Sequence, residues 1–284
     1  MDLLKREVVL IGSTGQGKNL LQGVGKDLSN ARAFFTSERG GKFYDSEVRT
    51  IFNKGLDEVS AAIHNTTADY QIVYFSGHGY TESISNRRML CLPDFSISDT
   101  YLLSRCPRQL IFADACRTLG GHTIGAIPGL GDEYENFTGS PVRELFDNWI
   151  KCSPAGKIII HSTPQGTVSL DSTNGGVFTR ALIDIANSYY PLDDSYYLPV
   201  GINKLLFDVE NALYEGGSHQ RPCIVYRSGD LQVPFSVAKR QRRAFIPKIS
   251  PSLTEMVQET PQSAPLSGLL VMGLIILGVA VLTA

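Results

Sequence analysis

The chain has 284 residues, of which 43% are hydrophobic, and this is the composition of a folded globular protein rather than of a disordered polyelectrolyte. Its 26 Lys and Arg residues against 28 Asp and Glu residues give a net charge of −2, which excludes a generally basic nucleic-acid-binding protein. Five cysteines without a CxxC pair exclude the usual structural zinc motifs.

The N-terminus is charged and lacks the apolar core of a secretory signal, so we expect a cytosolic body with reduced thiols. The first half of the chain then alternates apolar runs with helical apolar stripes. This pattern predicts strands over residues 7–12, 47–52 and 69–75, with helices over 27–37 and 56–64.

The second half continues the alternation, with strands predicted over 109–113, 157–160 and 222–226 and helices over 141–151, 177–187 and 202–214. Residues 120–139 contain six glycines and several acids, which is typical of a long loop. Alternating strands and helices predict an α/β fold with a mainly parallel six-stranded sheet flanked by helices. We expect one such domain, over residues 1–238.

Two predicted strands run directly into residues that can perform chemistry. One ends at His78, which stands between two glycines, and the other ends at Cys116, which follows Asp114 and Ala115. Reactive groups of parallel sheets collect beyond the carboxyl ends of the strands, so the thiol and the imidazole can meet there. A histidine within reach can deprotonate the thiol, and the backbone N–H groups of Gly79 and Cys116 are candidates to hold an oxyanion.

These motifs carry a family resemblance. Ser76-Gly77-His78-Gly79, with Asp114-Ala115-Cys116-Arg117 following 38 residues later, resembles the caspase-like cysteine peptidases, in particular their bacterial and metacaspase branches. The similarity covers about residues 5–236 and includes Leu21–Val24 before Asp27, Gly176–Thr179, Gln220–Pro222 and Pro234-Phe235. The resemblance implies a caspase-like fold and a cysteine-type endopeptidase with His78 and Cys116 as its catalytic dyad, which needs no metal or cofactor.

The resemblance also bears on specificity, because the chain has Asp114 where caspases have Gln. In the metacaspase-like branch this acid lies in the first specificity pocket, and Asp27 matches the position of a second pocket acid. Two carboxylates bind a guanidinium through charge-assisted hydrogen bonds, so cleavage after Arg, and also Lys, is expected. The structural alternatives are a helix N-cap for Asp27 and a strand-end turn for Asp114.

Some members of the family are activated by calcium or by cutting their own loop. The segment 120–157, with Arg143 and Lys151, is a candidate for such a cut. For bacterial relatives the resemblance implies a role in stress response, defence or regulated cell death. The substrate is a protein, and neither the activating signal nor the oligomeric state follows from the sequence.

Residues 266–284 contain 19 residues without a charge, long enough as a helix to span roughly 28 Å of bilayer. We predict a transmembrane helix there, preceded by a basic and Pro/Ser-rich juxtamembrane linker over 239–265. The basic residues between Lys239 and Arg243 favour anionic lipid and a cytoplasmic body. A tethered peptidase is expected to cut membrane-associated proteins.

Two other functions stay open. The segment Gly12–Lys18 follows a strand and nearly matches a phosphate-binding P-loop, but Asn19 replaces the Ser or Thr that binds magnesium. A nucleotide-binding protein is therefore one alternative, and a catalytically silent membrane-anchored scaffold is the other. His161, at the end of the fifth predicted strand, is a second candidate for the base, although His78 is favoured by its flanking glycines.

Overall fold

The structure is a computed structural model and describes residues 4–15, 17, 20–115, 140–191 and 196–240. Its last described strand ends at Lys239, next to the predicted domain boundary. The linker after residue 240 and the predicted membrane helix 266–284 lie outside the described residues. Among the helices that are described, none is both long and apolar enough to cross a bilayer.

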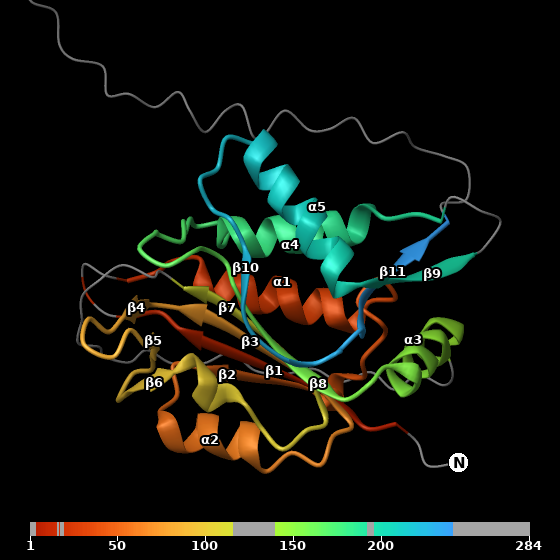
Figure 1. Ribbon diagram of the computed structural model, residues 1–284, viewed down its shortest axis with the longest axis horizontal. Coiled ribbons are helices and arrows are strands. Elements are labelled where there is room, and N and C mark those ends of the chain that lie inside the picture. The colour runs from red at the N-terminus through yellow and green to blue at the C-terminus, as the bar shows by residue number, and fades with distance from the viewer. Residues whose placement is uncertain (1–3, 16, 18–19, 116–139, 192–195, 241–284) are drawn as a thin grey trace, which may run out of the picture. The chain divides into compact units, whose positions relative to one another are not determined.

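A six-stranded sheet lies at the centre of the fold, in the order β10-β8-β7-β3-β1-β2 (Figure 1). All neighbouring strands in this order are parallel except β10, which runs antiparallel to β8. The strands are β1 (Arg6–Ser13), β2 (Val48–Phe52), β3 (Tyr70–Gly77), β7 (Arg108–Ala115), β8 (Gly156–His161) and β10 (Cys223–Gly229). The predicted α/β fold with a mainly parallel six-stranded sheet is confirmed.

Helices cover both faces of this sheet, with α1, α4 and α5 on one face and α2 on the other (Figure 1). Side chains of β1 alternate accordingly: Val8 and Leu10 join the core under α1 and α4, whereas Val9 and Ile11 join the core beside α2. Burial on both faces explains why the strands are continuous apolar runs. The helices are α1 (Val24–Thr36), α2 (Leu56–His64), α3 (Pro141–Cys152), α4 (Val177–Ser188) and α5 (Ile202–Glu215).

Helix α1 begins one turn earlier than predicted. Its N-cap is Gly23, so Asp27 lies inside the helix and the N-cap interpretation of Asp27 is wrong. A Cβ atom on Gly12 would lie 2.6 Å from Leu28 Cδ1 and 2.9 Å from Val24 Cγ1. The missing side chain of Gly12 therefore lets the first turns of α1 pack directly on the end of β1.

Two small sheets were not expected. An antiparallel sheet begins directly after His78 and consists of β4 (Gly79–Thr81), β5 (Arg88–Cys91) and β6 (Ser96–Ser98). The 3-10 turn η3 (Asp99–Leu102) follows β6 in the chain. β9 (Tyr197–Gly201) pairs with β11 (Pro234–Lys239), and the 3-10 turn η2 (Asp45–Glu47) precedes β2. Strands of three to six residues are too short for a periodic pattern to reveal them.

Candidate active site

The strand register brings the residues before the two predicted catalytic motifs to the same edge of the sheet. β3 and β7 are parallel neighbours, and Gly77 is the register partner of Ala115. His78 therefore directly follows Gly77, and Cys116 directly follows its partner Ala115. His78 is half-buried, and its carbonyl oxygen accepts a hydrogen bond from the Cys91 N–H at 2.9 Å, which fixes the backbone where β4 begins. Cys116 itself lies outside the described residues.

Gly79 is the first residue of β4, and its register partner is Leu90 on β5. The small sheet thus holds the backbone that follows His78 against two further strands. Its inner side is anchored by Leu90 and Ile97, which are buried against the core beside α2. The backbone around the predicted oxyanion donor is consequently part of a hydrogen-bonded sheet rather than an unsupported loop.

Asp27 and Asp114, the two predicted pocket acids, meet at the start of α4. Asp27 is 1% exposed and Asp114 is 5% exposed. A Cβ atom on Gly176, the N-cap of α4, would lie 2.5 Å from Asp114 Oδ2 and 3.3 Å from Asp27 Oδ2. Only glycine fits between the two carboxylates at this position, so the sequence motif around Gly176 has a direct steric reason.

Each acid accepts hydrogen bonds from the first turn of α4 and from a nearby hydroxyl group. Asp27 accepts from the Gly176 N–H and from the Ser76 hydroxyl, both at 2.8 Å. Asp114 accepts from the Thr179 hydroxyl at 2.7 Å, from the Thr179 N–H at 3.3 Å and from the Ser169 hydroxyl. The two acids therefore satisfy N–H groups at the helix start, where negative charge is favoured.

Burial and mutual repulsion disfavour two negative charges here. The pKa of Asp27 is raised to about 7, chiefly by burial and then by the nearby charge of Asp114. Burial also raises the pKa of Asp114, although hydrogen bonds from Ser169 and Thr179 oppose that shift. None of the ion pairs formed among the described residues involves either acid. A cationic side chain brought against the two carboxylates would relieve their repulsion.

His161, the alternative base, is in a different environment. It is 1% exposed, and its Nε2 atom lies 3.0 Å from Oδ2 of Asp99, which is itself 3% exposed. Arg88 of β5 lies 3.9 Å from the same carboxylate oxygen. A ring that is enclosed in this way cannot reach a peptide substrate, so the geometry favours His78.

Gly12, the first glycine of the P-loop-like segment, has a structural explanation. A P-loop requires a helix directly after its lysine, whereas α1 begins only at Val24, and residues 20–23 are not helical. Gly12 is required for helix packing, as described above. Lys18 and Asn19 lie outside the described residues. Among the residues that are described, no group of three or more His, Cys, Asp or Glu side chains is placed to bind a metal ion.

Comparisons with known proteins agree with this arrangement. A model of the caspase domain matches residues 5–232. The fold is similar to that of caspase-1 from Spodoptera frugiperda, with a TM-score of 0.50, 17% identity and coverage of 84% of this chain and 93% of that chain. It is also similar to protein GSU0716 from Geobacter sulfurreducens, with a TM-score of 0.51, 18% identity and coverage of 83% and 100%. A search of curated proteins gave no match.

Proposed function

Because the chain belongs to the caspase family of cysteine peptidases, we propose that it is a membrane-tethered endopeptidase that cleaves proteins after Arg, and also after Lys. The observation that carries the proposal is the pairing of Gly77 with Ala115, since it aligns the residues before His78 and Cys116 at one sheet edge. Asp114 lies at the end of β7, and Asp27 accepts a hydrogen bond from Ser76 near the end of the neighbouring β3. This position supports an acidic pocket for a basic P1 side chain beside the dyad.

In the proposed reaction His78 takes the proton of the Cys116 thiol, and the sulfur attacks the carbonyl carbon of the scissile peptide bond. The backbone N–H groups of Gly79 and Cys116 stabilise the negative charge on the carbonyl oxygen. His78 then gives its proton to the leaving amine, which departs as the acyl-enzyme forms. Water, deprotonated by His78, hydrolyses the thioester and restores the thiol.

Asp114 and Asp27 are proposed to recognise the P1 side chain. Both carboxylates are buried, so a guanidinium that reaches them leaves water and forms charge-assisted hydrogen bonds in a low-dielectric setting. A substrate Asp at the same place would add a third negative charge to a pair whose repulsion is already unfavourable. The pocket therefore favours Arg over Asp, in contrast to a pocket that reads acidic residues.

The apolar segment 266–284 is proposed to anchor the peptidase domain on the cytoplasmic side of a membrane, with the basic residues of the 239–265 linker attracted to anionic lipid. The substrate is then a membrane-associated protein, in a pathway of defence or regulated cell death. We propose that the peptidase is activated by a signal, because a constantly active peptidase would cleave membrane proteins without control.

The test uses the full chain and fluorogenic peptides that differ only in P1: Arg, Lys and Asp. We expect turnover after Arg, and a loss of about a thousandfold or more in Cys116→Ala and in His78→Ala. Cys152→Ala and His219→Ala remove an exposed thiol and an exposed imidazole elsewhere and should retain full activity.

Each alternative gives a distinct result. Faster turnover after Asp than after Arg would contradict the pocket assignment while leaving the dyad intact. No turnover of any peptide, with or without calcium, would favour the silent scaffold. Tight MgATP binding that Lys18→Ala abolishes would favour the nucleotide-binding alternative.

A further inference from the structure

A basic P1 preference leaves few bonds that the peptidase could cut in its own chain between Cys116 and β8. Residues 118–142 contain no Lys or Arg, and Arg143 is the only one between residues 118 and 150. The bond after Arg143, in the first turn of α3, is therefore the one candidate before the last turn of that helix. Whether the peptidase can cut its own chain between Cys116 and the end of α3 depends largely on the accessibility of this arginine.

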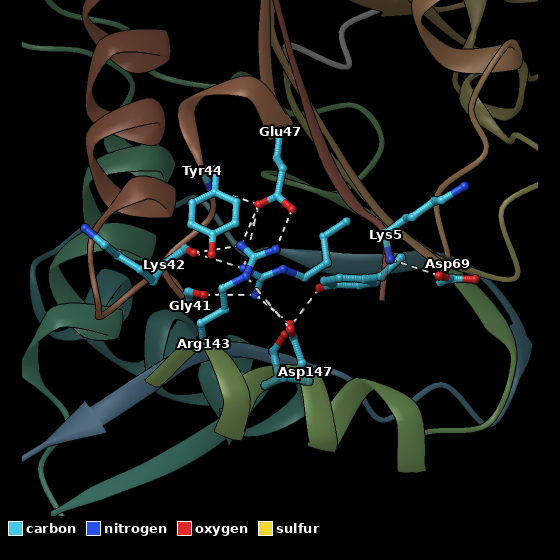
Figure 2. Close-up of polar contacts among 11 residues, drawn as sticks. Lys5, Gly41, Lys42, Tyr44, Glu47, Asp69, Arg143 and Asp147 are labelled. Atoms are coloured by element: carbon cyan, nitrogen blue, oxygen red, sulfur yellow. Dashed lines mark hydrogen bonds and ion pairs between the residues drawn. The ribbon is translucent and has the colours of Figure 1, made fainter. Parts of the chain in front are cut away.

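The side chain of Arg143 is fully engaged (Figure 2). Its two terminal nitrogens lie 2.7 and 2.6 Å from the two carboxylate oxygens of Glu47, and one of them also donates to the Lys42 carbonyl oxygen at 3.0 Å. The guanidinium carbon lies 3.8 Å from the centroid of the Tyr44 ring, and the side chain is only 12% exposed. An arginine held in this way is not available to a specificity pocket.

The backbone at Arg143 is equally constrained. It is the third residue of α3, between Val142 and Phe146, which are both 0% exposed in the main core. On the next turn Asp147 lies 3.2 Å from the Nη1 atom of Arg6, whose side chain is fully buried. A peptidase binds its substrate in an extended form, so cleavage here requires the start of α3 to leave the core.

Lys151, the next basic residue, lies in the last turn of the same helix. The preceding Ile150 is 0% exposed, and Trp149 Nε1 donates to the Gln232 carbonyl oxygen at 2.8 Å. The Ser153 N–H then closes the helix on the carbonyl oxygens of Trp149 and Ile150. The lysine head group is exposed, but the peptide bond beside it belongs to a packed helix.

We infer that this peptidase does not cut its own chain between residues 118 and 152, and that Glu47 protects the bond after Arg143 from the peptidase's own active site. The inference rests on the proposed specificity for basic P1 residues. It implies that the peptidase is activated by a signal and not by cutting its own chain on the C-terminal side of Cys116. Glu47 lies on η2, before β2, and binds both terminal nitrogens of Arg143. It also accepts a hydrogen bond from the Tyr44 N–H at 2.8 Å and lies 3.8 Å from the buried Arg6, so it joins the start of α3 to this turn.

The experiment follows the intact mass of the full chain while the same sample turns over the Arg-P1 peptide. The wild type should show no cut between residues 118 and 152. Glu47→Ala should release Arg143 and produce a fragment that ends there, and this fragment should be lost in Glu47→Ala/Arg143→Ala and in Glu47→Ala/Cys116→Ala. Asp45→Ala is the matched control, because it breaks the neighbouring pair with Arg32 (3.2 Å) and should stay uncut.

A second variant does not depend on how Glu47→Ala folds. Thr138→Arg places a basic residue between Cys116 and α3 in the sequence and keeps Glu47 and Arg143, and it should be cut after residue 138 only when Cys116 is present. A Cys116-dependent cut of the wild type between residues 118 and 152 would overturn the inference, as would an intact Thr138→Arg chain that still cleaves the Arg-P1 peptide. If no variant cleaves that peptide, the proposed function itself fails.

Discussion

Asp27 lies in α1, but its carboxylate interacts with the start of α4. Its carboxylate binds the Gly176 N–H, which is 149 positions away, and its pKa is raised by burial and by Asp114. No local pattern could reveal this partner, and the local signal pointed instead to an N-cap. The family resemblance singled out Asp27 together with Asp114, and in the structure both carboxylates lie against Gly176 at the start of α4.

The raised pKa makes a prediction about stability. A carboxyl whose pKa moves from 3.8 when unfolded to about 7 when folded favours the protonated native state. Its contribution is fully present below pH 3.8 and is lost as the pH rises through 7, a difference of roughly 4 kcal/mol. Thermal unfolding between pH 5 and 8 should therefore show a fall in the wild-type Tm that Asp27→Asn flattens.

The matched control is Asp57→Asn, which neutralises an exposed acid in the first turn of α2 and should leave the pH dependence unchanged. If the Tm of the wild type and of Asp27→Asn changed equally with pH, the pKa of Asp27 would not be raised in the folded state, and the prediction would be wrong. In a domain of this size each kcal/mol moves the Tm by about 2–4 °C, so the effect is measurable.

The elements that the sequence predicts best are those whose pattern is repeated over many residues. β1 and β3 are long apolar runs, and their burial on both faces follows from that pattern alone. Arg6 illustrates what the pattern misses. It opens β1 as a charged residue, yet its side chain is buried between the rings of Phe43 and Phe146, with its guanidinium carbon 4.2 and 5.4 Å from their centroids.

Arg6 fixes α3 to the start of β1, and its removal should be costly. Its guanidinium donates to the carbonyl oxygens of Gly41 and Lys42, both at 2.9 Å, and pairs with Asp147. Burial lowers its pKa to about 10, so it stays charged at neutral pH. Arg6→Ala leaves those acceptors buried without their donor, and we expect a loss of about 3–5 kcal/mol in the free energy of unfolding.

Urea-induced unfolding measures this loss directly. Arg49→Ala is the matched control, since Arg49 is an exposed arginine on the neighbouring strand β2 and its removal should change the free energy of unfolding by less than about 0.5 kcal/mol. A similar small change for Arg6→Ala would contradict the assigned role of the buried arginine. The expected loss also tests how firmly α3 is held, on which the protection of Arg143 depends.

At the scale of the whole molecule the charge is unevenly distributed. Residues 231–254 contain five basic residues and no acid, so the remainder of the chain has 21 basic residues against 28 acidic ones. An acidic body is repelled by an anionic bilayer, whereas the basic segment is attracted to it. We therefore propose that the apolar tail supplies the attachment and that the basic segment adds attraction to anionic lipid.

Membrane attachment through residues 266–284 can be tested by substitution within the full chain. Ile275→Arg/Leu277→Arg places two charges near the middle of the apolar segment, each costing about 2.5–3.5 kcal/mol on insertion scales. We expect the wild type to float with vesicles that contain anionic lipid and to remain bound after a high-salt wash, and the double variant to be released.

Arg242→Ala/Arg243→Ala should weaken binding only at low salt, because surface attraction is screened whereas burial of an apolar helix is not. Salt-sensitive binding of the wild type would instead assign the attachment to the basic segment alone.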